Sequence, residues 1–226
     1  MIKNVGLRRF LRLILPSVLI PAVAIFGTVI FDENRHIFVS LMVAFLTCIF
    51  FISGFERKET GTRRTVMITL IIALSVTGRF IPIFKPISAL TVIGAIYFGK
   101  EAGFMIGSMS ALVSNFYFGQ GPWTPFQMLS WGLIGLLAGL ISGSLKKNRT
   151  VLLLFGVLSG IFYSLVMDVW TVLWYSGGFS AELYLATVIA SLPHTVSYAV
   201  SNFAFLFFLA KPLGEKLERV VAKYKA

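Results

Sequence analysis

Long apolar runs separated by short polar segments are the feature that most limits what this chain can fold into. The first run, residues 13–31, contains about 19 residues, and at about 1.5 Å per residue a helix of that length crosses the ~30 Å hydrocarbon core of a bilayer. The composition agrees, since 57% of the 226 residues are hydrophobic and only 13% are charged, against roughly 45–50% apolar residues in a soluble domain. The sequence therefore predicts an all-α, polytopic membrane helical bundle.

The apolar pattern predicts eight membrane spans in two units. The first unit, residues 1–55, is a transmembrane hairpin of two spans, residues 13–31 and 36–55, and no signal-peptidase site follows its first span. The second unit, residues 64–226, is a core of six spans. Their predicted ranges are 65–77, 87–98, 102–118, 125–144, 150–175 and 191–210, and residues 179–191 are predicted to form a short helix on the outer surface.

The positions of the basic residues predict the orientation of these spans. The formal net charge is +11, and with both termini in the cytoplasm every lysine and arginine except Arg35, Arg79 and Lys85 lies on the cytoplasmic side. Cytoplasmic loops of membrane proteins carry such an excess of positive charge. The charge is therefore explained by the lipid bilayer, and no nucleic-acid partner is expected.

The sequence argues against a nucleotide-binding site and against a metal site. Residues 94–100 match the G-x-x-x-x-G-K pattern of a phosphate-binding loop, but Glu101 stands where that loop needs Ser or Thr, and the stretch lies in a predicted span. His36 and His194 lie on different segments and belong to no H-x-x-x-H pair. We therefore expect that the protein is not an enzyme and holds neither a metal nor a cofactor.

Residues 118–128 form the most distinctive loop in the sequence. Gly119 and Gly121 permit positive φ, and Pro125 suits the first turn of a helix whose predicted cap is Thr124. The segment is therefore expected to be a rigid, shaped loop.

The same loop carries side chains that suit a large ligand rich in amides. Gln120 and Gln127 offer neutral amide donors and acceptors, while Trp123 and Phe126 offer flat apolar surface. The alternative is a turn at the membrane interface with the tryptophan that is common there. Residue chemistry alone favours neither interpretation.

Polar residues within the predicted spans extend the candidate site. His194, Tyr198 and Asn202 recur every fourth residue on the last span, and Asn115 ends a face of small residues. Asp168 is expected to point into the bundle, because an unpaired carboxylate is costly in lipid. Arg79 and Lys85 are the cations expected near it, and a purely structural polar network is the alternative.

Small residues also recur every fourth position on the span of residues 65–77. Thr69, Ala73 and Thr77 lie on one predicted stripe. Small side chains let another helix approach closely in lipid, so this stripe is a candidate docking surface for a partner protein.

Residues 64–226 resemble the substrate-binding S component of energy-coupling factor (ECF) vitamin transporters. The loop of residues 118–128 followed by residues 130–135, with residues 192–194 and Ser201-Asn202 later, resembles the cobalamin-type branch. The family has an A-x-x-x-A motif that meets the coupling subunit. Ala73 and Thr77 match it as A-x-x-x-T. The N-terminal hairpin is not part of the family's six-helix pattern.

The resemblance implies a function in vitamin uptake across a prokaryotic plasma membrane. It implies that the chain binds cobalamin or a related corrinoid and works with an ECF transmembrane coupling subunit and two ATPase subunits that hydrolyse ATP. Another vitamin, a modified-base precursor, or a membrane scaffold without transport activity are the alternatives. The expected substrate-binding residues are Arg79, Asn115, Gln120, Trp123, Phe126, Gln127, Asp168, His194, Tyr198 and Asn202.

Overall fold

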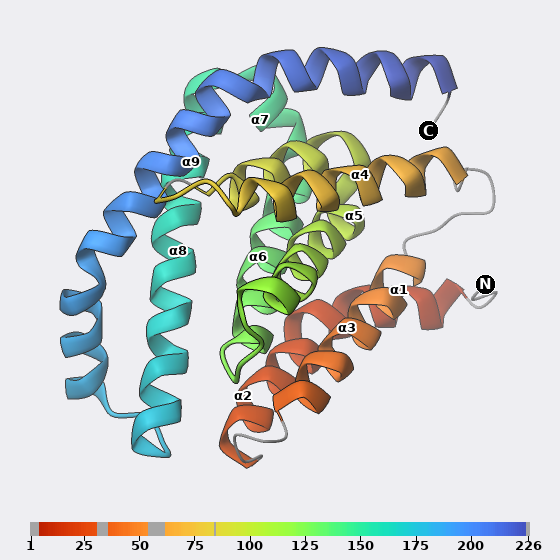
Figure 1. Ribbon diagram of the computed structural model, residues 1–226. Helices are drawn as coiled ribbons and strands as arrows, with labels where there is room; N and C mark the ends of the chain where they lie inside the picture. The colour runs from red at the N-terminus through yellow and green to blue at the C-terminus, as the bar shows by residue number, and fades with distance from the viewer. Residues whose placement is uncertain (1–4, 31–35, 54–61, 84, 225–226) are drawn as a thin grey trace.

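The computed structural model describes residues 5–30, 36–53, 62–83 and 85–224, and within these ranges it is helical and contains no strand (Figure 1). The protein is a helical membrane bundle, as the sequence predicts. The elements are α1 (Val5–Ile14), the π-helical turn η1 (Leu15–Leu19), α2 (Ile20–Ile30), α3 (His36–Ser53), α4 (Thr62–Gly78), α5 (Ile87–Phe118), α6 (Thr124–Leu140), α7 (Ser142–Lys147), α8 (Arg149–Ser176) and α9 (Ala181–Tyr224).

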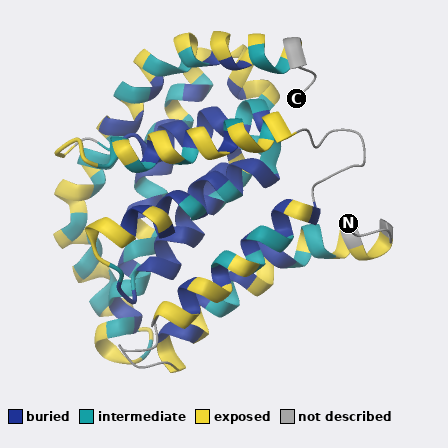
Figure 2. Ribbon diagram, turned by 45° about the vertical axis from the view of Figure 1, so that its right-hand side comes forward, coloured by how far each residue is buried: buried dark blue, intermediate teal, exposed yellow. Residues whose placement is uncertain are grey.

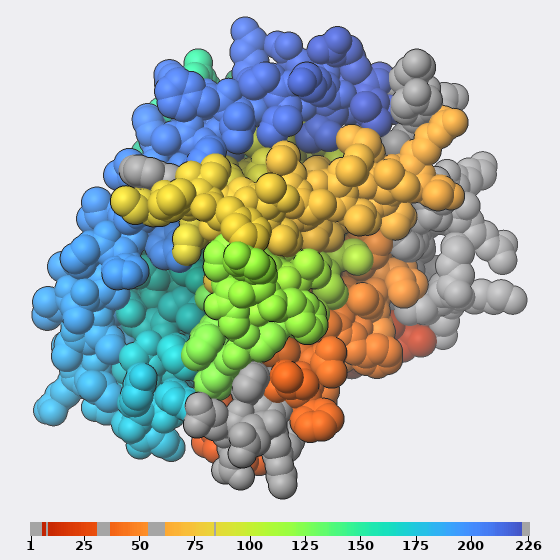
Figure 3. Space-filling model, in the orientation of Figure 1, coloured from red at the N-terminus to blue at the C-terminus, as the bar shows by residue number. Residues whose placement is uncertain are grey.

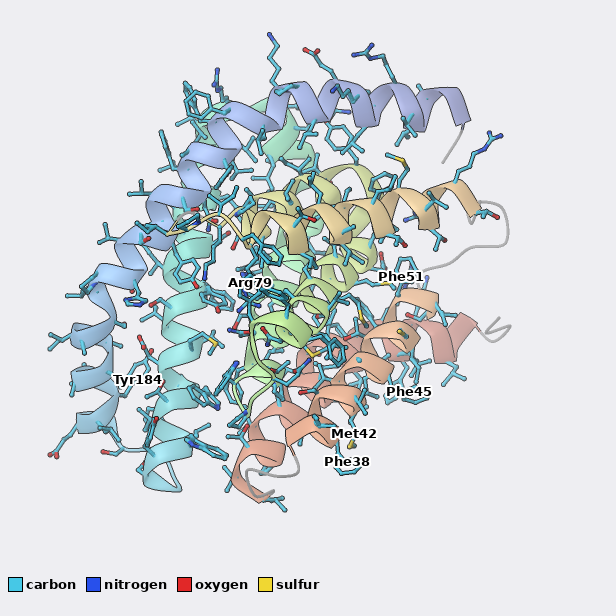
Figure 4. The ribbon with its side chains drawn as sticks, in the orientation of Figure 1. Phe38, Met42, Phe45, Phe51, Arg79 and Tyr184 are labelled. Carbon is cyan, nitrogen blue, oxygen red and sulfur yellow. The ribbon has the colours of Figure 1, made fainter. Side chains whose placement is uncertain are left out.

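By length and composition, four helical segments of the described residues could cross a membrane, and one of them, Ile87–Phe118, contains the turn at Gly99 described below. They are Arg9–Ile30, Ile87–Phe118, Arg149–Ser176 and Ala181–Ala222, and Ile37–Ser53 and Thr124–Leu140 are shorter apolar helices. Many large apolar residues are exposed, and the exposed positions lie on the outer faces of the helices (Figure 2). Phe38, Met42 and Phe45 project outward from α3 (Figure 4), and Phe45 is 67% exposed. Such surfaces are expected to face lipid.

The N-terminal hairpin packs against the rest of the bundle. Its first arm is α1, η1 and α2, its second arm is α3, and together they contact α5, α6 and α8. An ion pair joins the first arm of the hairpin to α5, because Arg12 Nε lies 3.1 Å from Oε1 of the buried Glu101 side chain. The two arms of the N-terminal hairpin thus form as predicted. The division of the chain into a hairpin unit, residues 1–55, and a core unit, residues 64–226, stays a prediction.

The centre of the bundle is α5, which turns back on itself at Gly99. Gly99 has φ 84°, a left-handed conformation that glycine adopts without strain. The two arms then lie side by side, and a Cβ on Gly103 would lie 2.5 Å from Ala95 Cβ. The predicted tight turn near residue 99, between two helical arms, is confirmed, whereas the assignment of each arm as a separate membrane span stays a prediction.

The arm after this turn crosses α6 with the two backbones in contact. A Cβ on Gly107 would overlap the carbonyl of Trp131, and a Cβ on Gly135 would overlap the carbonyl of Gly103. The small residues on both helices therefore allow this close approach. Gly143 has open space around it instead.

The last two helices, α8 and α9, form a second close pair, and here one prediction is wrong. Residues 181–191 are not a separate short helix but the first turns of α9, which has 44 residues. Ser180 begins the helix, because its Oγ accepts a hydrogen bond from the Leu183 amide at 3.3 Å. Pro193 lies inside α9 and does not start it.

Candidate functional site

Arg79 anchors a polar network in the middle of the bundle (Figure 4). It follows the end of α4, and its Nη1 donates to Ser114 Oγ at 2.6 Å and to Asn115 Oδ1. The guanidinium also lies 4.9 Å from the ring centre of Phe118 and 5.8 Å from that of Trp131. Neutral acceptors and aromatic faces therefore stabilise this half-buried cation.

Asn115 is the centre of this network. It is completely buried, and besides accepting from Arg79 its Nδ2 donates to Thr124 Oγ1 at 2.8 Å and to Gln127 Oε1 at 2.9 Å. One side chain on α5 thus joins the segment after α4 to the first turn of α6.

Tyr163 on α8 continues the network to the other side of the bundle. Its hydroxyl accepts from Gln127 Nε2 at 3.2 Å. Its ring stacks on Trp131 at 4.6 Å and lies at 4.8 Å from Tyr198 of α9. Tyr163 is buried, so the hydrogen bond and the two ring contacts fix its position.

The pocket next to Tyr163 lies between α8 and α9 and has a volume of about 400 Å³. Its walls combine aromatic rings, hydroxyl groups, one imidazole and one carboxylate. The lining residues are Tyr163, Ser164, Met167, Asp168, Thr171, Thr187, Ala190, Ser191, His194 and Tyr198. A pocket of this size and character suits a small amphipathic ligand.

Asp168 supplies the only carboxylate among the residues that line this pocket. Ser191 Oγ donates to Asp168 Oδ2 at 2.8 Å. The expectation that Arg79 or Lys85 lies beside Asp168 is wrong, because no ion pair joins it to a cation in the described part of the chain. Asp168 therefore keeps acceptor capacity that a ligand hydroxyl could use.

The two cations near the network lack a carboxylate partner in the described ranges. Burial lowers the pKa of Arg79, and burial together with the charge of Arg79 lowers the pKa of Lys85. Their segment lies against the middle of α9, where Ser201 Oγ donates to the Lys85 carbonyl at 3.2 Å. Neither Arg79 nor Lys85 lines the pocket between α8 and α9.

The predicted substrate-binding residues fall into three places. Arg79, Asn115 and Gln127 share the network, and Asp168, His194 and Tyr198 line the pocket. Asn202 does neither, because it is buried between α8 and α9 and donates to the Gly156 carbonyl at 3.2 Å. Whether these side chains bind substrate stays a prediction.

The remaining predicted residues lie in or beside the loop of residues 118–128. Gln120 Nε2 donates to the Leu112 carbonyl at 3.1 Å, and Phe126 is buried in the core. Trp123 packs edge to face on Trp170 with ring centres 5.9 Å apart. None of the three lines the pocket between α8 and α9.

The start of α6 differs in one detail from the predicted cap. The helix begins at Thr124, with Trp123 at the N-cap position and no capping hydrogen bond from its side chain. Thr124 Oγ1 instead accepts from the Gly121 amide at 3.3 Å and from Asn115. Thr124 therefore closes the turn and ties it to α5.

Sequence reasoning missed Tyr163, Ser114 and Ser191. Helical spacing could have indicated Tyr163, because it follows Gly160 and Gly156 by three and seven residues and so lies on the same face of the helix as these two small residues. Ser114 carries no such signal, because serine in a helix most often bonds to its own backbone.

The stripe of small residues on α4 lies on the surface of the molecule. Thr69, Ala73 and Thr77 are all exposed, and α4 crosses the front of the space-filling view as a continuous band (Figure 3). Thr69 Oγ1 donates to the Thr65 carbonyl at 3.0 Å, and Thr77 Oγ1 donates to the Ala73 carbonyl at 2.9 Å. Both hydroxyls are therefore satisfied within the helix, and the stripe presents small groups.

A polytopic helical bundle with a polar network beside an amphipathic pocket defines a membrane protein that can hold a small molecule between its helices. In the described ranges, no group of histidine, cysteine, aspartate or glutamate side chains could hold a metal ion. The site thus offers recognition by hydrogen bonds and aromatic surfaces.

Comparison with known proteins assigns the family. The model of the family described as "ECF-type riboflavin transporter, S component" matches residues 59–218, and the chain belongs to this family. Two curated relatives, both described as UPF0397 proteins from strains of Aliivibrio fischeri, are 27% identical over 123 residues. The match covers 51% of this chain and 62% of each relative, so it spans less than two thirds of their length. No solved structure matches the chain.

Proposed function

We propose that this protein is the membrane-embedded substrate-binding subunit of an ECF-type importer in a prokaryotic plasma membrane. Partner subunits hydrolyse the ATP, and this chain selects the vitamin that is taken up. Membership of the S-component family supports the class. The pocket of about 400 Å³ beside Tyr163 is the observation that carries the binding role.

The proposed substrate is riboflavin or a vitamin of similar size with a flat heteroaromatic ring. The pocket volume falls in the range of about 300–1,000 Å³ that is typical of small-molecule sites. The rings of Tyr163 and Tyr198 offer stacking surface. Asp168, His194 and the neighbouring hydroxyls match a polyol chain, which needs several donors and acceptors.

A corrinoid such as cobalamin is the second candidate. The amide groups of Asn115, Gln120 and Gln127 favour it, because corrinoids carry many amides. Its size argues against it, since a corrinoid has several times as many non-hydrogen atoms as a flavin. It would need much more room than the pocket between α8 and α9 provides.

The proposed docking surface for the transmembrane coupling subunit is the stripe of Thr69, Ala73 and Thr77 on α4. Its exposure and the internal bonding of both threonine hydroxyls support this assignment. Helices pack closely in lipid where small side chains allow it. The coupling subunit would connect this chain to the two ATPase subunits.

The function is tested by measuring which ligand the purified chain holds. Mass spectrometry of the protein released from detergent should detect a bound flavin, and titration should show saturable binding of riboflavin. Tyr198→Ala should weaken this binding, because it removes one wall of the pocket, whereas Tyr97→Ala, at the other end of the bundle, should not. Saturable binding of cobalamin alone would move the assignment to the corrinoid. Failure to bind any vitamin or to co-purify with ATPase subunits would favour a scaffold.

A further inference from the structure

A second cavity lies at the opposite end of the bundle from the vitamin pocket. It has a volume of about 330 Å³ and lies where α7, the start of α8 and the later part of α9 meet the first arm of α5. These elements meet at the top of Figure 1. The cavity shares no lining residue with the pocket beside Tyr163.

This cavity combines an apolar wall with a basic rim. Ile93, Ile96, Leu152 and Leu206 contribute to the wall. The rim holds four basic side chains and two acidic ones. These are Lys146, Lys147, Arg149, Lys211, Glu215 and Glu218. The rim therefore has an excess of positive charge next to a surface that excludes water.

Two of the basic side chains are held in place by the protein itself. Lys146 Nζ lies 2.7 Å from Glu218 Oε1. Arg149 Nη2 donates to the Phe207 carbonyl at 3.1 Å, and its guanidinium carbon lies 4.1 Å from the centre of the Phe207 ring. Arg149 is thus positioned by the carbonyl and the ring of Phe207, neither of which carries a charge.

The other two basic side chains have no such partner. Lys147 and Lys211 are exposed, and neither forms an ion pair with an acidic side chain in the described ranges. Together with Arg149 they place three basic side chains outside any ion pair with the described acidic residues around one cavity, and Glu215 lowers the net charge of the rim to +2. Such a rim attracts a phosphate group, whereas the apolar wall beneath it suits a hydrocarbon chain.

We propose that this cavity binds an anionic phospholipid, with the headgroup phosphate on Lys147, Arg149 and Lys211 and an acyl chain on the apolar wall. Basic pockets between membrane helices on the side rich in lysine and arginine have this chemistry. A free phosphate would use the rim but leave the wall in water. The proposed occupant is therefore a lipid from the leaflet on the side rich in lysine and arginine, and not a soluble anion.

The test compares lipid binding by the full chain and two charge variants in detergent. Native mass spectrometry and melting curves would be recorded with phosphatidylglycerol, with phosphatidylcholine and with inorganic phosphate. The variant Lys147→Gln/Lys211→Gln should bind phosphatidylglycerol on the order of 30-fold more weakly than wild type, because each basic residue at the surface contributes to anionic lipid binding. The matched control Lys216→Gln/Arg219→Gln changes the charge equally but lies outside the cavity, and it should bind like wild type.

A second variant tests the apolar wall without changing charge. Ala210→Phe would fill the cavity from α9, and it should reduce retention of phosphatidylglycerol while riboflavin binding stays unchanged. The proposal is wrong if both charge variants lose lipid equally, if phosphatidylcholine binds as well as phosphatidylglycerol, or if inorganic phosphate gives the same thermal shift. It is also wrong if the Lys147 and Lys211 variant loses only its binding to the coupling subunit, which would make the cavity a protein interface.

Discussion

Removing the Asn115 side chain should destabilise the protein more than removing any other single buried amide of the described bundle. Asn115→Ala deletes one hydrogen bond from the charged Arg79 and two that Asn115 donates, to Thr124 and Gln127. A hydrogen bond to a charged group contributes about 1.5–3 kcal/mol, and a neutral one about 0.5–1.5 kcal/mol. Because the three bonds form one network and are not additive, we expect a loss of about 3 kcal/mol in the free energy of unfolding.

Asn202→Ala is a matched control, because Asn202 is equally buried and loses the same side-chain volume. Asn202 donates one hydrogen bond, to the Gly156 carbonyl, while its Oδ1 has no partner. Its removal should therefore cost about 1–2 kcal/mol less than that of Asn115. Reversible unfolding of both variants in mixed micelles with sodium dodecyl sulfate would give the two free energies.

The comparison also separates the network from cavity formation in general. If cavity formation dominated, the two variants would lose nearly equal stability, and the argument from hydrogen bonds would be refuted. A conservative variant gives a further check. Asn115→Asp keeps an acceptor for Arg79 but loses both amide donors, so its stability should lie between those of wild type and Asn115→Ala.

Three further predictions test other surfaces. Ala73→Leu should weaken pull-down of the coupling subunit without changing vitamin affinity, because it replaces a small side chain of the stripe on α4 by a bulky one. The control Ala186→Leu, at an exposed position on α9, should have no effect on the pull-down. Gly107→Ala should destabilise the bundle by about 1–3 kcal/mol, because the added Cβ would overlap the Trp131 carbonyl, whereas Gly143→Ala, in open space, should be neutral or slightly stabilising in the same unfolding assay. Trp123→Ala should lower stability by about 2 kcal/mol through loss of its packing on Trp170, with riboflavin affinity near wild type in titration. A large loss of affinity would instead place the loop of residues 118–128 in the vitamin site.

The features that the sequence predicted well are those controlled by small residues and by chain turns. A glycine followed by two charged residues between apolar runs can only be accommodated by a turn, and Gly99 makes that turn. The face of small residues that Asn115 ends includes Gly107, which packs directly on the α6 backbone, because close helix crossings in lipid require small side chains at each contact. Such features depend on local spacing alone.

The wrong expectations concern long helices and polar side chains. The sequence Ser191-Leu192-Pro193 resembles a helix start, but a proline is tolerated within a membrane helix when its neighbours satisfy the backbone. The periodicity of His194, Tyr198 and Asn202 also misled, because each fourth residue on a helix turns about 40° further around its axis. His194 and Tyr198 therefore line the pocket, whereas Asn202, further along the helix, is buried against α8.

The pairing of side chains from distant segments could not be predicted from spacing. Gln127 meets Tyr163 only because α6 and α8 pack side by side. Ser191 donates to Asp168 because α9 begins at Ala181, so that Ser191 lies within the helix and alongside α8. In both cases the partner is fixed by helix packing, which local sequence patterns do not report.

The position of Arg79 links the two surfaces that the proposed function needs. Arg79 follows Thr77 by two residues, so the proposed docking stripe on α4 ends where the polar network begins. The network continues from Arg79 through Asn115 and Gln127 to Tyr163, which lines the pocket between α8 and α9. A ligand that displaces Tyr163 would disturb hydrogen bonds that hold the end of α4. The pocket proposed for the vitamin and the proposed contact with the coupling subunit are thus joined by four side chains, and Asn115→Ala, which interrupts this chain of contacts, should weaken the dependence of coupling-subunit binding on the vitamin.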